Sequence, residues 1–245
     1  MTAAHDPAPG AGIPALDRLA EYLAGRFDKL YGSLRVMAVN YVALLEPRFG
    51  AAELGPFDHG DIVRMRDLSY MVLDSHPKTF GAGVVFDLDR IAASDQTIQW
   101  HVRGDDGYEP YGFVYDGDSP EFYDYIGLPW FDEPKRTGEP VLAGPYLDFL
   151  GVDEYILTAS VPFEIGHRFA GTASSDIEVR TIERMFLEQA RGIDADIALT
   201  NLEGRIVCTN SSRFLPGETV DESTVDLAFD LPTRSRTLRA VAAAR

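Results

Sequence analysis

The sequence predicts an α+β fold with an antiparallel sheet, and three observations carry this prediction. A long stretch near the N-terminus has the apolar periodicity of one amphipathic helix. Short β-type runs then follow in pairs that are separated by turn residues, as in hairpins. Helices and strands do not alternate regularly, so a parallel sheet built from βαβ units is not expected.

The first predicted element is the long N-terminal helix. Its apolar residues recur at steps of three and four and therefore share one face: Leu16, Leu19, Leu23, Phe27, Leu30, Leu34, Met37, Tyr41 and Leu44. Pro47 and the stretch from Gly50 to Gly55 end the pattern, which leaves about 30 residues, or about 45 Å of helix. A helix of this length covers the core of its own domain, or it extends beyond that domain and forms the seam of a homodimer.

The remaining elements are shorter. A second helix is expected from Asp58 to His76, because Asp58 or Asp61 can cap its start and Pro77 follows its end. Residues 81–86, 97–103, 155–163 and 168–177 are predicted strands, and residues 181–191 are a predicted helix. Residues 196–210 are predicted to form a hairpin that turns at Glu203-Gly204. The pattern weakens beyond residue 221, where we expect a frayed tail, and residues 1–12 are expected to be loose.

Composition excludes several classes of partner and site. The chain has 245 residues, with 39 acidic and 22 basic ones, and a formal charge of −17. This balance disfavours nucleic acid and anionic membrane surfaces, because their phosphates would repel the protein. Cys208 is the single cysteine, so an intrachain disulfide and a four-thiolate metal site are both impossible. The sequence shows neither a secretory signal nor an apolar stretch long enough to span a membrane, so the cytoplasm is the expected location.

One window is unusually acidic and aromatic at once. Residues 104–133 hold nine carboxylates and nine aromatic residues but no lysine or arginine. Aromatic faces attract cations and exclude water, while a carboxylate supplies the opposite charge. The window therefore predicts a pocket for a small organic cation. The alternative is a solvated acidic loop whose aromatic residues anchor it to the core.

Several short motifs follow one another from this window to the end of the fourth predicted strand. They are Tyr123-Asp124-Tyr125, Trp130-Phe131, Lys135-Arg136-Thr137-Gly138-Glu139-Pro140, Gly144-Pro145-Tyr146-Leu147-Asp148, Thr158-Ala159-Ser160-Val161-Pro162, Gly171 and Asp176-Ile177. In this order and spacing they resemble the ligand-binding module of Cache domains, the PAS-like sensors of bacterial receptors. With the long helix and the Gly-Val-Val-Phe run, the resemblance extends over most of residues 13–190.

The resemblance implies a fold in which the long N-terminal helix packs on a PAS-like twisted antiparallel sheet, with a small-molecule pocket over the sheet. Residues 13–190 would form this Cache-like module. Residues 191–245 resemble the start of a truncated second module followed by the frayed tail. Because the chain has no predicted span, a signal would pass through a separate regulator or signalling protein, or through a change in the dimer.

The resemblance also implies individual site residues. Trp130 matches the aromatic that walls the ligand, with Phe131 beside it. Tyr146 and Asp148 match a Tyr-x-Asp pair, and Asp176 matches the carboxylate that holds a ligand ammonium. Four tyrosines are candidates to complete an aromatic cage, namely Tyr108, Tyr111, Tyr115 and Tyr125.

The carboxylate side of the family site is changed in this chain. Amino-acid-binding members place an arginine two residues before the tryptophan, where this sequence has Leu128. The resemblance therefore favours the amine-binding branch of double Cache domains. His101 or Arg103 on the preceding strand remains a candidate for binding a carboxylate, so an amino-acid or betaine-type ligand stays open. Both carboxylates also have purely structural alternatives. Asp148 would cap a turn, and Asp176 would cap the helix that follows it.

These observations predict a soluble Cache-type sensor that binds an organic amine and is not an enzyme. The alternative of another class is a hydrolase with Asp148 and Asp176 as an acid/base pair. The sequence has no Gly-x-Ser-x-Gly motif, phosphate loop or metal motif that would support an enzyme. We expect no cofactor and no metal.

Overall fold

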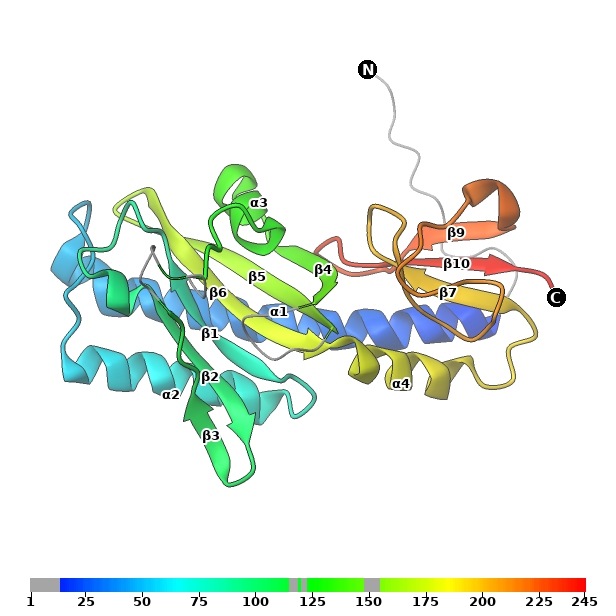
Figure 1. Cartoon of the computed structure of the whole chain (residues 1–245), viewed down its shortest axis with the longest axis horizontal. Coiled ribbons are helices and arrows are strands. Elements are labelled where there is room, and N and C mark those ends of the chain that lie inside the picture. Colours follow the sequence, from blue (N-terminus) through cyan, green and yellow to red (C-terminus); the bar gives the residue numbers. More distant parts are fainter. Residues whose placement is uncertain (1–13, 115–118, 120–122, 148–154) are drawn as a thin grey trace, which may run out of the picture. The chain divides into compact units, whose positions relative to one another are not determined.

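The computed structural model describes residues 14–114, 119, 123–147 and 155–245. Within them the chain forms two compact units (Figure 1). One consists of Lys29–Glu178, and the other combines the described residues up to Asp28 with Val179–Arg245. Residues 1–12, which were expected to be loose, lie outside the described part. No helix in the described ranges is long and apolar enough to cross a membrane.

The long helix α1 spans Pro14–Phe49, and its residues contribute to both units. The predicted apolar face is buried apart from Leu44, which is partly exposed, and Leu16, Leu23 and Leu34 are fully inaccessible to solvent. The helix ends at Gly50, whose φ of 52° is a left-handed conformation that glycine adopts without steric cost. The apolar periodicity thus gave the helix and its buried side correctly.

The unit Lys29–Glu178 contains a six-stranded antiparallel sheet in the order β3-β2-β1-β6-β5-β4 (Figure 1). The strands are β1 (Gly81–Phe86), β2 (Ile98–Gly104), β3 (Gly107–Pro110), β4 (Val141–Leu147), β5 (Tyr155–Ile165) and β6 (Arg168–Glu178). A short 3-10 helix at Ser94–Gln96 connects β1 to β2. The predicted α+β class with its antiparallel sheet is confirmed.

Two short helices of this unit lie against different faces of the sheet. Helix α2 (His59–Ser75) packs on β1 and β2, and its start is fixed by a reciprocal capping box between Asp58 and Asp61. Helix α3 (Pro129–Thr137) packs on β4, β5 and β6. Because side chains alternate between the faces of a strand, each strand supplies residues to both layers.

The unit that includes Val179–Arg245 contains helix α4 (Val179–Ala190) and a four-stranded antiparallel sheet in the order β8-β7-β10-β9. Its strands are β7 (Asp196–Thr200), β8 (Ile206–Thr209), β9 (Leu227–Asp230) and β10 (Arg239–Ala243). A 3-10 helix at Glu222–Thr224 precedes β9. Cys208 on β8 is buried, which raises the pKa of its thiol and makes it a poor nucleophile.

The expectation of a frayed tail was wrong. Strand β10 lies between β7 and β9, pairs with both, and is largely buried. Its alanine-rich sequence carries a weak strand signal, so its structure depends on partners that are distant in sequence. The two units also divide at Glu178 rather than at residue 190, so α4 groups with the C-terminal strands.

Candidate functional site

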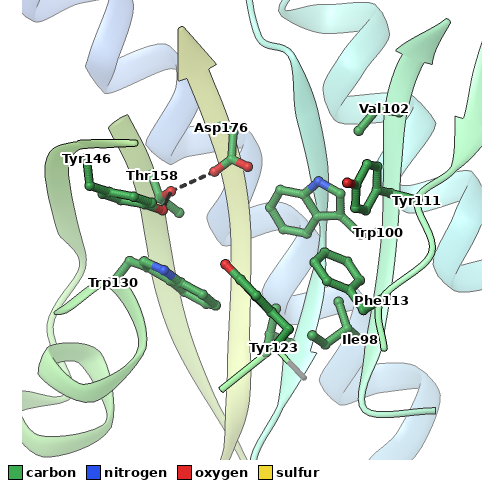
Figure 2. Close-up of a pocket in the computed structure, with 11 residues that line it drawn as sticks. Ile98, Trp100, Val102, Tyr111, Phe113, Tyr123, Trp130, Tyr146, Thr158 and Asp176 are labelled. Carbon is green, nitrogen blue, oxygen red and sulfur yellow. Dashed lines mark hydrogen bonds between the residues drawn. The ribbon is translucent and has the colours of Figure 1, made fainter. Parts of the chain in front are cut away.

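A pocket lies on the face of the six-stranded sheet that α3 covers (Figure 2). Its empty space is about 420 Å³ including the open mouth. Its lining residues are Val85, Ile98, Trp100, Val102, Tyr111, Phe113, Tyr123, Trp130, Tyr146, Thr158 and Asp176.

Strand register brings the polar lining residues together. Thr158 on β5 is the direct partner of Asp176 on β6, and Asp176 is in turn the partner of Gly81 on β1. Directly opposed residues of an antiparallel pair point to the same face, so Thr158 and Asp176 emerge side by side. On β2, the alternate residues Ile98, Trp100 and Val102 point to this face as well.

Three side chains form a hydrogen-bonded chain at the polar end of the pocket. Thr158 Oγ1 donates to Asp176 Oδ1 at 2.6 Å, and the Tyr146 hydroxyl is hydrogen-bonded to Thr158 Oγ1 (Figure 2). An ionised carboxylate only accepts, so Thr158 gives its single hydroxyl hydrogen to Asp176, and Tyr146 must donate to Thr158. The bonds therefore run toward a carboxylate that is 8% exposed. This end of the pocket presents acceptors.

Helix α3 brings Trp130 over the pocket. Pro129 occupies the first helical position, where its fixed φ suits a helix start, and Gly138 ends the helix with a φ of 72°. Trp130 is 4% exposed, and among the described residues its indole Nε1 has no hydrogen-bond partner. A buried N–H without an acceptor is costly, so Trp130 presents a donor that a bound molecule could satisfy.

A salt bridge fixes the far end of α3. Lys135 Nζ lies 2.8 Å from Asp87 Oδ2, directly after β1, and 3.6 Å from Asp89 Oδ2. Burial lowers the pKa of Lys135, but the hydrogen bond and charge of Asp87, together with the charge of Asp89, outweigh it and raise the pKa overall. The helix that carries Trp130 is thus anchored to the sheet by a charged pair.

The structure brings four of the sequence-predicted site residues to the pocket, namely Tyr111, Trp130, Tyr146 and Asp176. Tyr125 and Phe131 are buried beside it. The Tyr125 ring stacks on Trp130 with centroids 6.1 Å apart, and its hydroxyl donates to the Phe86 carbonyl at 2.6 Å. Phe131 contacts Trp130 edge to face at 5.9 Å. Both rings therefore pack against the Trp130 indole.

Tyr115 and Asp148 lie outside the described residues. The Asp176 side chain accepts a hydrogen bond from Thr158 within the sheet, while α4 begins only at Val179. This contact differs from the helix cap that was the structural alternative for Asp176. Leu128 lies at the N-cap of α3 and packs against the aromatic cluster around Trp130.

His101 lies on the opposite face of the sheet from the pocket. Its neighbours Trp100 and Val102 line the pocket, so the alternation of β2 turns His101 toward α2, where it meets Tyr70 edge to face at 5.2 Å. It is 5% exposed, and burial, together with the nearby charge of Arg66, lowers its pKa from 6.5 to about 4. This placement does not support His101 as a ligand-binding residue.

Arg103, the other candidate for a ligand carboxylate, also faces α2. It donates to the carbonyls of Leu73, His76 and Thr79 and to the Tyr108 hydroxyl. Its donors are therefore used within the protein, away from the pocket.

Trp100 is the main pocket residue that sequence reasoning missed. The run from Thr97 to Arg103 was recognised as an alternating strand, but alternation alone does not say which set of side chains faces the ligand. The residues that could have indicated the orientation of Trp100 lie on the neighbouring strand β1. Gly81 and Gly83 are the two positions of β1 over which the Trp100 indole lies. Within the described ranges, no group of three or more His, Cys, Asp or Glu side chains is arranged to hold a metal ion.

A family comparison fits this geometry. Residues 66–184 match the family model of the methyl-accepting chemotaxis protein-like, first PDC sensor domain. The match begins within α2 and ends within α4, so it includes every strand of the six-stranded sheet and all the residues that line the pocket. No curated protein matches the chain.

Solved structures share the fold of this chain at low identity. A methyl-accepting chemotaxis protein X has a TM-score of 0.65 at 15% identity and covers 94% of this chain and 95% of its own. The ligand-binding domain of a Pseudomonas aeruginosa PAO1 amino acid chemoreceptor, in complex with GABA, has a TM-score of 0.59 at 16% identity, with coverages of 91% and 94%. That of a Campylobacter jejuni chemoreceptor with L-valine has a TM-score of 0.57 at 11% identity, with coverages of 93% and 91%. At these identities the likeness shows the fold.

Proposed function

We propose that this protein is a small-molecule sensor module that binds an organic amine on the pocket face of its six-stranded sheet. The ammonium group would lie at Asp176, and the aromatic lining would surround the rest of the molecule. The observation that carries the proposal is a buried carboxylate, hydrogen-bonded to Thr158, at the end of a pocket whose other lining residues are aromatic or aliphatic. The match of residues 66–184 to a chemotaxis sensor domain supports the general role.

The direction of the hydrogen bonds supports an ammonium ligand. Tyr146 donates to Thr158, and Thr158 donates to Asp176, so the groups facing the pocket at this end are acceptors. An ammonium has donors only, and it also lowers the cost of keeping a carboxylate away from water. Aromatic faces nearby add cation–π attraction, which is strongest for tryptophan.

A second candidate ligand is an amino acid or a betaine-type molecule. It is favoured by Trp130 Nε1, a buried donor without a partner among the described residues, because a ligand carboxylate would accept from it. The two receptor domains that share the fold were solved with GABA and L-valine, and both molecules carry an ammonium and a carboxylate. Against it stands Leu128, which supplies no charge for a carboxylate.

A thermal-shift panel of primary amines, amino acids and carboxylic acids separates these ligands. A ligand present at a hundredfold excess over its Kd stabilises the folded protein by about 2.7 kcal/mol. Amines alone raising the melting temperature would support the amine site, and amino acids raising it further would support the second candidate. A shift by carboxylic acids only, or by none of the panel, would contradict the proposal.

The enzyme alternative is not proposed. It required Asp148 and Asp176 as an acid/base pair, and Asp148 lies outside the described residues. Proteins that share the fold are sensor and chemoreceptor domains, which supports binding rather than catalysis. Incubating the panel with the protein and finding unchanged compounds by mass spectrometry would agree with this; turnover would contradict it.

We also propose that the protein forms a homodimer through α1. Val36 and Val39 of this helix are 50% and 66% exposed, although both are apolar. Sedimentation at increasing concentration would give a dimer, whereas a monomer throughout would contradict it. The separate signalling partner and the cytoplasmic location stay predictions.

A further inference from the structure

The Trp100 indole lies in a space that exists because β1 has no side chain there. A Cβ placed on Gly81 would lie 2.5 Å from Trp100 Nε1 and 3.2 Å from Cε2. A Cβ on Gly83 would lie 2.8 Å from Trp100 Cε3. Real Cβ atoms essentially never come within 3.0 Å of another atom, so a side chain at either position would force the indole or the neighbouring strand to shift. The two glycines therefore let the indole lie flat across β1.

This position puts Trp100 next to the proposed ammonium site. Gly81 is the register partner of Asp176 on one side and of Val102 on the other, so the indole nitrogen lies over the strand position that adjoins Asp176. Figure 2 shows Trp100 on one side of Asp176, with Thr158 and Tyr146 on the other. Groups attached to a nitrogen held by Asp176 would therefore meet the indole.

We propose that Gly81 and Trp100 together determine specificity, with the indole limiting the size of the groups on the bound nitrogen. This inference rests on the proposed amine site. Trp100 is 8% exposed and packs in the same cluster as Val85, Ile98 and Trp130, so the indole is held in place rather than free to swing aside. A fixed aromatic wall discriminates by excluded volume, and one methylene is worth about 10- to 200-fold in such a pocket.

Gly81 and Gly83 differ in a way that makes a clean test possible. At Gly81 the three atoms nearest to an added Cβ all belong to the side chains of Trp100 and Val102. At Gly83 the nearest is the backbone oxygen of Gln99, at 2.2 Å, so Gly83→Ala would push the strands apart. Gly81→Ala instead displaces the indole toward the pocket, and removing the indole relieves the clash.

The experiment measures the Kd of three probes by calorimetry: butylammonium, N-methylbutylammonium and trimethylbutylammonium. In the unaltered protein, affinity should fall along this series. Trp100→Leu should reduce the difference between the first and last probe by about 10-fold. Gly81→Ala should weaken butylammonium by about 10-fold, yet the double variant should bind it within about threefold of Trp100→Leu alone, because coupled sites are not additive. Gly32→Ala, at an exposed position of α1 where an added Cβ meets nothing, is the matched control.

Every other result of these titrations would contradict the inference that the Trp100 indole limits the size of the bound groups. Unchanged selectivity among the probes in Trp100→Leu would overturn the inference but not the proposed amine site. The same would follow if Gly81→Ala lowered the affinity for butylammonium equally with and without the indole. Tightest binding of trimethylbutylammonium, lost in Trp100→Leu, would also overturn the size limit. If the unaltered protein binds none of the three probes, the proposed function fails and the inference fails with it. Should Trp100→Leu fold poorly by circular dichroism, Trp100→Phe replaces it with the same expected direction.

Discussion

Strand β2 supplies two very different environments from one run of seven residues. Its residues Ile98, Trp100 and Val102 line the pocket, whereas His101 and Arg103 between and after them face α2. On the α2 face, a charged side chain is surrounded by protein acceptors. On the pocket face, a buried carboxylate and an indole N–H border an empty space.

Arg103 on the α2 face and Trp130 on the pocket face differ in how their donors are used. Arg103 uses its donors on three carbonyls and a hydroxyl of its own chain. Trp130 Nε1 has no such partner among the described residues. Substitutions on the α2 face should therefore change the free energy of unfolding, and substitutions on the pocket face should change ligand affinity.

The largest effect is expected from Arg103→Met on the α2 face. The substitution keeps much of the side-chain volume but leaves the carbonyls of Leu73, His76 and Thr79 without their donor. A single hydrogen bond to a charged group contributes about 1.5–3 kcal/mol, but the bonds of one partly buried side chain do not add, so we expect the free energy of unfolding to fall by about 3 kcal/mol. Urea denaturation measures this fall. A folded variant that loses amine binding without losing stability would break the comparison.

The second largest effect is a pH dependence of the free energy of unfolding, which we expect from His101. Its pKa is about 4 in the folded protein and near 6.5 when unfolded, so the unfolded state binds more protons between these values. Stability is therefore fully present above pH 6.5 and is lost as the pH falls toward 4. Between pH 7 and pH 5 this amounts to about 2 kcal/mol.

His101→Leu is the control for this prediction, because other groups also titrate in the same range. The difference between the two proteins isolates the contribution of His101 beside Tyr70 and Arg66. Denaturation curves at pH 7 and pH 5 should show a smaller change in the variant. Equal changes in both proteins would mean that His101 is not held neutral by burial.

The smallest effect is expected from Thr158→Val on the pocket face. Valine has a similar shape but removes the hydroxyl that joins Tyr146 to Asp176. We expect amine affinity to fall about 10-fold, equivalent to about 1.4 kcal/mol, with stability changed by about 1 kcal/mol. Calorimetric titration and urea denaturation give the two numbers. A large loss of stability with unchanged affinity would put Thr158 with the α2-face residues.

Local sequence patterns predicted much of the fold because its elements carry strong local signals. The periodic leucines gave α1, and the paired β-type runs gave the hairpins of the larger sheet. Strand β10 was missed since its short alanine-rich sequence becomes a strand only between β7 and β9. Local periodicity does not predict which segments that are distant in sequence will pair as strands.

The site was predicted in part for a similar reason. Trp130, Tyr146 and Asp176 were found because their spacing resembles a known sensor family, and they do line one pocket. His101 was misplaced and Trp100 overlooked, because assigning a strand's two faces requires knowledge of what covers each face. The glycines opposite Trp100 held that information only once the register was known.

The central claim is that the carboxylate of Asp176 binds an ammonium, and comparing two carboxylates tests it most directly. Asp176→Asn removes the charge on the pocket face, while Asp74→Asn removes one on α2, where Asp74 accepts from Tyr108. With the amine that gives the largest thermal shift, calorimetry should show affinity falling about 100-fold in Asp176→Asn, or about 2.7 kcal/mol, and by less than about threefold in Asp74→Asn. Equal affinities in the two folded variants would contradict the account.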